Sequence, residues 1–194
     1  MIDQKIYILL TDTGTLFTRM IKLYTKKPYN HASISFDPQL TEVYSFGRKA
    51  ARNPFIGGFV KENIRSKLFT KAKCVLFSCS VTQSQLQDLH DYIQKIELEK
   101  DLYRYNLLGL ATVTINKQMN RKNAFFCSQF VATVLKECKV AHFTKPLSLV
   151  TPHDFMEHTN FQLIYQGSIE AFCQENDIQS FEKSTCLTAK QLIY

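Results

Sequence analysis

Two alternating segments joined by a short turn constrain the fold of this chain most. Residues 31–36 read HASISF and residues 41–46 read TEVYSF. Between them, the sequence DPQL at 37–40 places a proline where β-turns favour it. Alternation of polar and apolar residues with a period of two is typical of strands with one buried face. The sequence therefore predicts an antiparallel hairpin, and with it a sheet.

The remaining segments divide into strand-like and helix-like patterns. Short apolar runs predict further strands at 5–10, 59–64, 72–81 and 161–165. Helical spacing of apolar residues predicts helices at 15–24, 84–99, 107–113 and 126–138. Residues 48–58 contain Pro54, Gly57 and Gly58 and are predicted to form a loop. We therefore expect one α+β domain, a twisted antiparallel sheet packed against helices, with the helix at 126–138 central.

Length and charge limit the function classes that fit this chain. Its 194 residues are expected to form one domain over residues 1–170, which residues 171–194 extend. The net charge of +7 is dispersed and no nucleic-acid-binding motif accompanies it, so no nucleic-acid partner is expected. No apolar run approaches the roughly 18 residues of a membrane-spanning helix. No secretory signal pattern is visible, so a cytoplasmic location is expected.

The six cysteines show no metal-binding or disulfide spacing. They lie at positions 74, 79, 127, 138, 173 and 186, without a CxxC pair. The segment HDFMEH at 153–158 lacks the HExxH order of zinc hydrolases, so neither a metal nor a cofactor is expected. Five of the cysteines are interpreted as buried thiols in a reducing compartment. Cys127 has a second interpretation.

Cys127 begins the predicted apolar helix, and His31 begins the first strand of the hairpin. A cysteine on an apolar helical stripe is most often a small core residue. A cysteine in the first turn of a helix, beside unpaired backbone N–H groups and a protonated histidine, is instead favoured as a thiolate. The same N–H groups can stabilise an oxyanion on a substrate carbonyl. Cys127 and His31 are therefore the candidate nucleophile and base.

The predicted hairpin also offers partners for the imidazole. If Phe36 pairs with Thr41 across the turn, Ser33 lies opposite Tyr44 and His31 lies opposite Phe46. Residues on one face then include Glu42 and Tyr44, and either could hydrogen-bond His31 and fix its tautomer. The negative charge of the carboxylate favours Glu42, whereas the register favours Tyr44. Both remain candidates for orienting His31.

Four motifs carry a resemblance to a known family. The sequence has NHASISF at 30–36, EVYSFGRK at 42–49, FFCSQFVATVL at 125–135 and TPHDF at 151–155. In this order they resemble the permuted NlpC-type papain-like cysteine amidases and peptidases, over roughly Ile6 to Tyr165. The resemblance implies that Cys127 is the nucleophile and His31 the base. The family's third residue falls near Val43–Tyr44, where a histidine or glutamate is commoner, so this chain departs from the pattern.

The resemblance implies a cysteine-dependent amidase or peptidase that acts through an acyl-thioester on a peptide, amino-acid amide or acyl substrate. A lecithin-retinol-type acyltransferase would use the same cysteine and histidine. A binding module without catalysis, which keeps the papain-like fold, is a further alternative. Tyr105, in the segment YRYN at 103–106, is a candidate pocket residue or a packing tyrosine.

Overall fold

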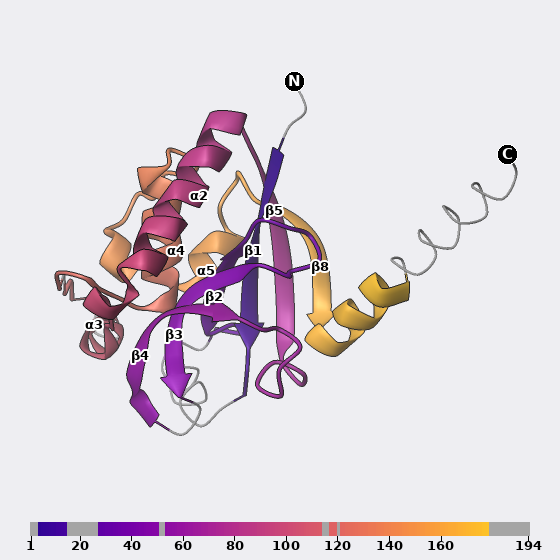
Figure 1. Cartoon of the computed structure of the whole chain (residues 1–194), viewed down its shortest axis with the longest axis horizontal. Helices are drawn as coiled ribbons and strands as arrows, with labels where there is room; N and C mark the ends of the chain where they lie inside the picture. Colours follow the sequence, from indigo (N-terminus) through magenta and orange to yellow (C-terminus); the bar gives the residue numbers. More distant parts are fainter. Residues whose placement is uncertain (1–3, 15–26, 51–52, 114–116, 120, 179–194) are drawn as a thin grey trace, which may run out of the picture.

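A six-stranded antiparallel sheet forms the centre of the molecule (Figure 1). The computed structural model describes residues 4–14, 27–50, 53–113, 117–119 and 121–178. The strand order is β4-β3-β2-β1-β5-β8, and every neighbouring pair is antiparallel. The strands are β1 (Gln4–Asp12), β2 (His31–Ser35), β3 (Val43–Ala50), β4 (Asn53–Glu62), β5 (Lys73–Val81) and β8 (Gln162–Ser168). The expected α+β architecture, an antiparallel sheet packed against helices, is confirmed.

The predicted helices agree closely with the observed ones. The structure contains α2 (Gln83–Leu98), α3 (Leu107–Val113), α4 (Cys127–Glu137) and α5 (Pro152–Met156), with 3-10 turns η1 (Lys100–Leu102) and η2 (Leu147–Leu149). The helix predicted at 15–24 lies outside the described residues. Two short strands, β6 (Arg104–Tyr105) and β7 (Ala124–Phe125), pair in parallel. Within the described part of the chain, every helix is too short or too polar to span a bilayer.

The central strand β1 is buried on both faces of the sheet. Ile6, Ile8 and Leu10 point into one core, whereas Tyr7 and Leu9 point into another. A strand that is covered on both sides needs a continuous apolar run rather than alternation. This requirement explains the sequence IYILL at 6–10.

The larger core lies between the sheet and the helices α2, α4 and α5. The stripe predicted for residues 126–138 faces this core, and Phe130, Val131 and Leu135 are completely buried in it. Phe46 of β3 lies among several aromatic rings, with ring centroids 4.9 Å from Phe130 and 5.2 Å from Phe125. These contacts fix the start of α4 against the sheet.

Residues 63–72 and a helix at 169–178 contribute to the smaller core on the other face. Ile169 and Phe172 of that helix are buried there, next to Leu9 and Leu76 of the sheet. In Figure 1 this helix follows β8 and lies apart from α2 and α4. The boundary expected at residue 170 thus falls inside a helix that helps to form the core.

The loop predicted at 48–58 is wrong, because most of it belongs to a long β3–β4 hairpin. The ladder runs from Val43 paired with Glu62 to Ala50 paired with Asn53. Glycine and proline disfavour strands by propensity. Here, however, Gly57 is required by a close approach: a Cβ atom on it would lie 2.7 Å from Tyr105 Cβ and 2.7 Å from the Gly47 carbonyl oxygen. In this segment, Gly57 indicates close packing within a hairpin and does not indicate a loop.

The start of α2 gives a testable stability prediction. Thr82 Oγ1 accepts a hydrogen bond from Gln85 N, and the Gln85 side chain accepts one from Thr82 N in return. Substituting Thr82→Ala removes one acceptor for the unpaired first-turn amides. We expect a loss of about 1 kcal/mol in the free energy of unfolding, measured by urea denaturation. The exposed substitution Gln87→Ala is the control and should cost less than half of that.

Candidate active site

Cys127 is the first residue of α4 and is separated from β7 (Ala124–Phe125) by Phe126 alone. The residue before it, Phe126, is buried and caps the helix through its backbone alone, without a side-chain hydrogen bond. The amides of the first turn are therefore available to a negative charge. The backbone N–H of Ser128, in this first turn, lowers the pKa of the Cys127 thiol. Cys127 itself is only 3% exposed.

The start of β2 brings His31 to the thiol. Asn30 N donates to Thr11 O at 3.1 Å, and Asn30 Nδ2 donates to Asp12 Oδ1 at 2.8 Å, so the end of β1 holds this segment in place. The Asn30 carbonyl oxygen lies 4.0 Å from the Cys127 sulfur. The charges of the His31 imidazole and of the Cys127 thiolate each shift the pKa of the other group, as expected for two adjacent side chains.

The ladder between β2 and β3 is short, so the first residues of β2 have no partner in β3. Only Ile34 with Tyr44 and Ser35 with Val43 are paired in this ladder. The first residues of β2 lie beyond its end, and the backbone N–H of Ala32 in this segment lowers the pKa of the Cys127 thiol. Two backbone amides, one in β2 and one in α4, thus favour the thiolate form of the same cysteine.

Glu62, the last residue of β4, is the partner of His31. Its Oε1 atom lies 2.7 Å from His31 Nε2 and accepts a hydrogen bond from Ser45 Oγ at 2.7 Å. Its Oε2 atom accepts a hydrogen bond from Ser33 Oγ at 2.6 Å. The side chains of His31 and Glu62 are 15% and 8% exposed, so water screens their interaction little. The carboxylate is held by three donors and orients the imidazole toward Cys127.

Electrostatic interactions favour the charged form of all three side chains. Burial raises the pKa of Cys127, but the charge of His31 and hydrogen bonds from His31, Ala32 N and Ser128 N lower it below the ordinary thiol value. Burial lowers the pKa of His31, but the charges of Glu62 and Cys127 raise it well above 6.5. Burial raises the pKa of Glu62, but the charge of His31 and hydrogen bonds from His31, Ser33 and Ser45 lower it. A thiolate beside an imidazolium is the state that this geometry stabilises.

The other described thiols differ from Cys127. Burial raises the pKa of Cys74 to about 12 and that of Cys138 to about 11. Burial also raises the pKa values of Cys79 and Cys173. Cys186 lies outside the described residues. Among the described cysteines, Cys127 alone has a lowered pKa.

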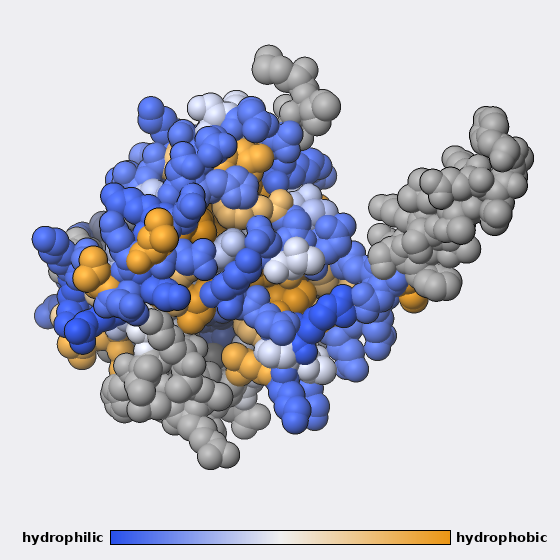
Figure 2. Space-filling view, viewed as in Figure 1, coloured by the Kyte–Doolittle hydropathy of each residue, from blue (hydrophilic) through white to orange (hydrophobic). Residues whose placement is uncertain are grey.

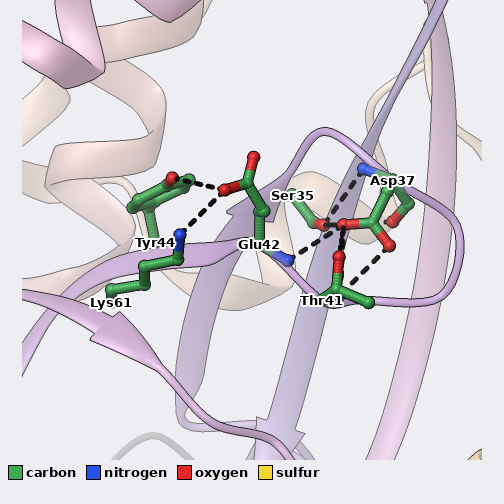
Figure 3. A network of polar contacts seen from close by, with 6 residues as sticks. All are labelled: Ser35, Asp37, Thr41, Glu42, Tyr44 and Lys61. Atoms are coloured by element: carbon green, nitrogen blue, oxygen red, sulfur yellow. Dashed lines mark hydrogen bonds and ion pairs between the residues drawn. The ribbon is translucent and has the colours of Figure 1, made fainter.

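The expected orienting role of Tyr44 or Glu42 is wrong, because the hairpin register differs by one residue. Tyr44 pairs with Ile34 instead of Ser33, so it faces the helix-covered core and not the face of His31. The side chains of Tyr44 and Lys61 both hydrogen-bond Glu42 Oε1, at 3.5 and 2.8 Å (Figure 3), whereas the imidazole of His31 pairs with Glu62.

The turn explains this shift. The carboxylate of Asp37 accepts hydrogen bonds from Thr41 N and Glu42 N (Figure 3), and Leu40 has a positive φ of 58°. These features close a wider loop over residues 36–42 than the four-residue turn that was predicted.

Tyr105 and the histidine-rich segment have structural contacts. Tyr105 packs against the larger core beside Gly57. In the segment 153–158, His153 Nε2 lies 3.1 Å from Glu157, while Asp154 caps α5 and pairs with Lys145. The described residues hold no group of three or more His, Cys, Asp or Glu placed to bind a metal. A role for Tyr105 in a substrate pocket stays a prediction.

Sequence reasoning missed Glu62 because it treated residues 48–58 as a loop. Had 41–50 and 53–62 been paired as a hairpin, Glu62 would have fallen beside Val43, on the same face as Ser45 and His31. The available signal was the acidic residue that ends the strand-like segment FVKE at 59–62.

No family model matches the sequence, and no curated protein matches it either. The chemistry of the site is therefore the main guide to function. A thiolate at a helix N-terminus, next to a histidine that a carboxylate orients, is competent for nucleophilic attack on an acyl carbon.

Proposed function

We propose that this protein is a cysteine-dependent amidase or peptidase with a permuted papain-like fold. The observation that carries the proposal is the buried chain of side chains Cys127–His31–Glu62, in which the thiol pKa is lowered. Structural thiols in apolar surroundings have raised pKa values, as the other described cysteines do. A lowered pKa at one cysteine favours a role in chemistry over a role in packing.

The first half of the reaction forms a thioester. The Cys127 thiolate attacks the carbonyl carbon of an amide, and the carbonyl oxygen becomes an oxyanion. The His31 imidazolium then gives its proton to the amide nitrogen, the C–N bond breaks, and the amine leaves. General acid catalysis of this kind contributes about 10²–10⁴-fold.

The second half releases the acyl group. Neutral His31 takes a proton from water, the resulting hydroxide attacks the thioester carbon, and the C–S bond breaks to regenerate the Cys127 thiolate. Glu62 stays ionised throughout and stabilises the imidazolium in each half-reaction. If an alcohol or amine replaces water, the same residues catalyse acyl transfer.

The resemblance to permuted NlpC-type enzymes supports this proposal. The histidine strand precedes the cysteine helix in the chain, and both begin at the motifs on which the resemblance depends. A glutamate is one of the common third residues in that family, and Glu62 of β4 supplies it here in place of Val43–Tyr44. The proposed substrate is a small peptide, amino-acid amide or acyl amide, and the reduced thiol fits a cytoplasmic location.

Selective alkylation tests this proposal. Iodoacetamide at about pH 6.5 should modify Cys127 at least about tenfold faster than the other thiols, because only a thiolate reacts and an ordinary thiol is about 1% ionised there. Mass spectrometry of tryptic peptides after timed quenching gives the rate at each cysteine.

The Cys127→Ser variant is the control, since it should lose the fast phase and keep the slow ones. If all six cysteines react at similar slow rates in the folded wild type, the site is not an activated nucleophile. A binding module without catalysis would then be favoured.

A further inference from the structure

Asn30, the residue before His31, carries a buried oxygen without a hydrogen-bond partner. Asn30 is only 6% exposed, and its Oδ1 atom is unpaired. The orientation of the amide is fixed, because Asn30 Nδ2 donates to Asp12 Oδ1 at 2.8 Å and a carboxylate can only accept. Oδ1 is therefore the atom that is left over. A buried acceptor without a donor destabilises a fold, so its presence requires an explanation.

Asn30 also lies beside the nucleophile. Its main-chain oxygen is 4.0 Å from the Cys127 sulfur. A carbonyl carbon that the thiolate attacks must come within about 3.5 Å of that sulfur. Substrate atoms one or two bonds from this carbon therefore come to lie next to residue 30.

Two more buried oxygens without partners belong to residues that adjoin the site. Thr11 pairs with His31 in the β1–β2 ladder, and its Oγ1 atom is unpaired. Gln129 follows Cys127 by two residues in α4, and its Oε1 atom is unpaired as well. Native folds leave few buried polar atoms without a partner. Unmet hydrogen-bonding capacity next to His31 and Cys127 indicates that a ligand supplies the missing donors.

We propose that Asn30 Oδ1 accepts a hydrogen bond from an amide N–H on the acyl side of the substrate, so that the enzyme takes peptides or N-acylated amino acids. This inference rests on the proposed function and narrows its substrate class. An amide oxygen can only accept, so its partner must be a donor. In a peptide, the N–H group lies two bonds from the attacked carbonyl carbon. A simple fatty-acyl amide has a CH₂ group in that place.

A buried acceptor selects its substrate by rejecting molecules that lack the donor. A substrate without the N–H leaves Oδ1 unpaired, and sites built in this way discriminate strongly against such analogues. On the face drawn in Figure 2, apolar side chains of the described residues lie in separate patches among hydrophilic ones. This face favours a short polar substrate over a long acyl chain.

Two chloromethyl ketones that differ in one group test the proposal. The chloromethyl ketone of N-acetylalanine carries the N–H, whereas that of O-acetyl-lactic acid has an ester oxygen in the same place. In both, the Cys127 thiolate forms a C–S bond and chloride leaves. Each rate is divided by the rate with glutathione, which corrects for intrinsic reactivity. In the wild type, the corrected rate should be at least about tenfold higher for the compound with the N–H.

The variant Asn30→Leu tests the residue. Leucine is close to asparagine in size and has no acceptor, so the ratio of the two corrected rates should fall by at least about fivefold. A residue that only held this segment in place would lower both rates together and leave their ratio unchanged. The matched control is Asn160→Leu, an exposed asparagine that donates to the Val140 carbonyl oxygen at 3.3 Å, beyond the C-terminal end of α4. It should change neither rate.

Equal corrected rates for the two ketones in the wild type would overturn the proposal and would indicate that water pairs with Oδ1. This comparison needs no variant, so it decides the question even if Asn30→Leu does not fold. An unchanged ratio in folded Asn30→Leu would also overturn it. Fast alkylation of Cys127 by iodoacetamide with equal ketone rates would contradict the substrate class alone. Slow alkylation by all three reagents would contradict the proposed function as well.

Discussion

Replacing His31 with alanine is expected to slow the alkylation of Cys127 at about pH 7 by 10²-fold or more. The variant loses both the charge of His31 and its hydrogen bond, which are the two largest influences that lower the thiol pKa. Burial, which raises that pKa, remains. The protonated thiol should then predominate at neutral pH.

The buried cysteines of the same molecule indicate how far the pKa should move. Burial is the largest influence on the pKa values of Cys138 and Cys74, which are raised to about 11 and about 12. A thiol with a pKa of about 11 is ionised to about one part in 10⁴ at pH 7. Without His31, Cys127 should approach this behaviour, although the amides of Ala32 and Ser128 still stabilise the anion.

The measurement is the rate of iodoacetamide modification as a function of pH. For the wild type, the rate should rise through a midpoint below the ordinary thiol pKa of about 8.5, whereas for His31→Ala the midpoint should lie above it. The matched control is His90→Ala, which removes an exposed imidazole stacked on Phe36 and should leave the profile unchanged. A midpoint that is the same in the wild type and in His31→Ala would show that the two groups are not coupled.

The sequence predicted Cys127 and His31 as members of the candidate site, because local patterns determine both. Cys127 begins an apolar helical stripe, and His31 begins an alternating strand. Periodicity detects each element without knowledge of its neighbours. The contact between the two elements was not contained in either pattern. It was expected from the order of the motifs, which resembles that of a known family.

The residue that orients His31 could not be predicted in the same way, because its position depends on the register of the strands. A shift of one residue in the β2–β3 pairing moves Tyr44 to the opposite face and brings Ser45 to the face of His31. The side chain of Asp37 and the positive φ of Leu40 determine that register, and both belong to the turn rather than to the strands. Glu62 was missed for a further reason. The glycine at position 57 is required by close packing, but in the sequence it resembled part of a loop, so the hairpin that ends at Glu62 was not predicted.

Substituting Glu62→Gln is expected to reduce the alkylation rate of Cys127 at about pH 7 by roughly 10-fold or more. Glutamine keeps the size of the side chain and removes its charge. The pKa of His31 should therefore fall, because the charge of Glu62 is the first influence that raises it. A neutral imidazole no longer stabilises the thiolate by its charge, so the thiol pKa should rise. Glu62→Ala should also destabilise the fold by about 3–5 kcal/mol, since it breaks a buried pair.

The control for this substitution is Glu42→Gln, because Glu42 is the carboxylate that the sequence alone favoured. Its pair with Lys61 is about half exposed on both sides, so its loss should cost at most about 1 kcal/mol and leave Cys127 unaffected. If Glu42→Gln slowed alkylation as much as Glu62→Gln, the assignment of Glu62 as the orienting residue would be wrong.

The free energy of unfolding should also depend on pH. The direction in which Glu62 changes it with pH follows from the lowered pKa of Glu62. That pKa is lowered in the folded protein, so its stabilising contribution is complete above the ordinary value of 4.5 and is lost as the pH falls through the folded value. The difference in unfolding free energy between wild type and Glu62→Gln should therefore shrink below about pH 4.5. His31 has the opposite sign: its raised pKa stabilises the fold below pH 6.5, and this contribution is lost as the pH rises through the folded value. Urea unfolding at several pH values measures the contributions of both Glu62 and His31. If the difference in unfolding free energy between the wild type and Glu62→Gln grew toward acid pH, it would contradict an ionised Glu62.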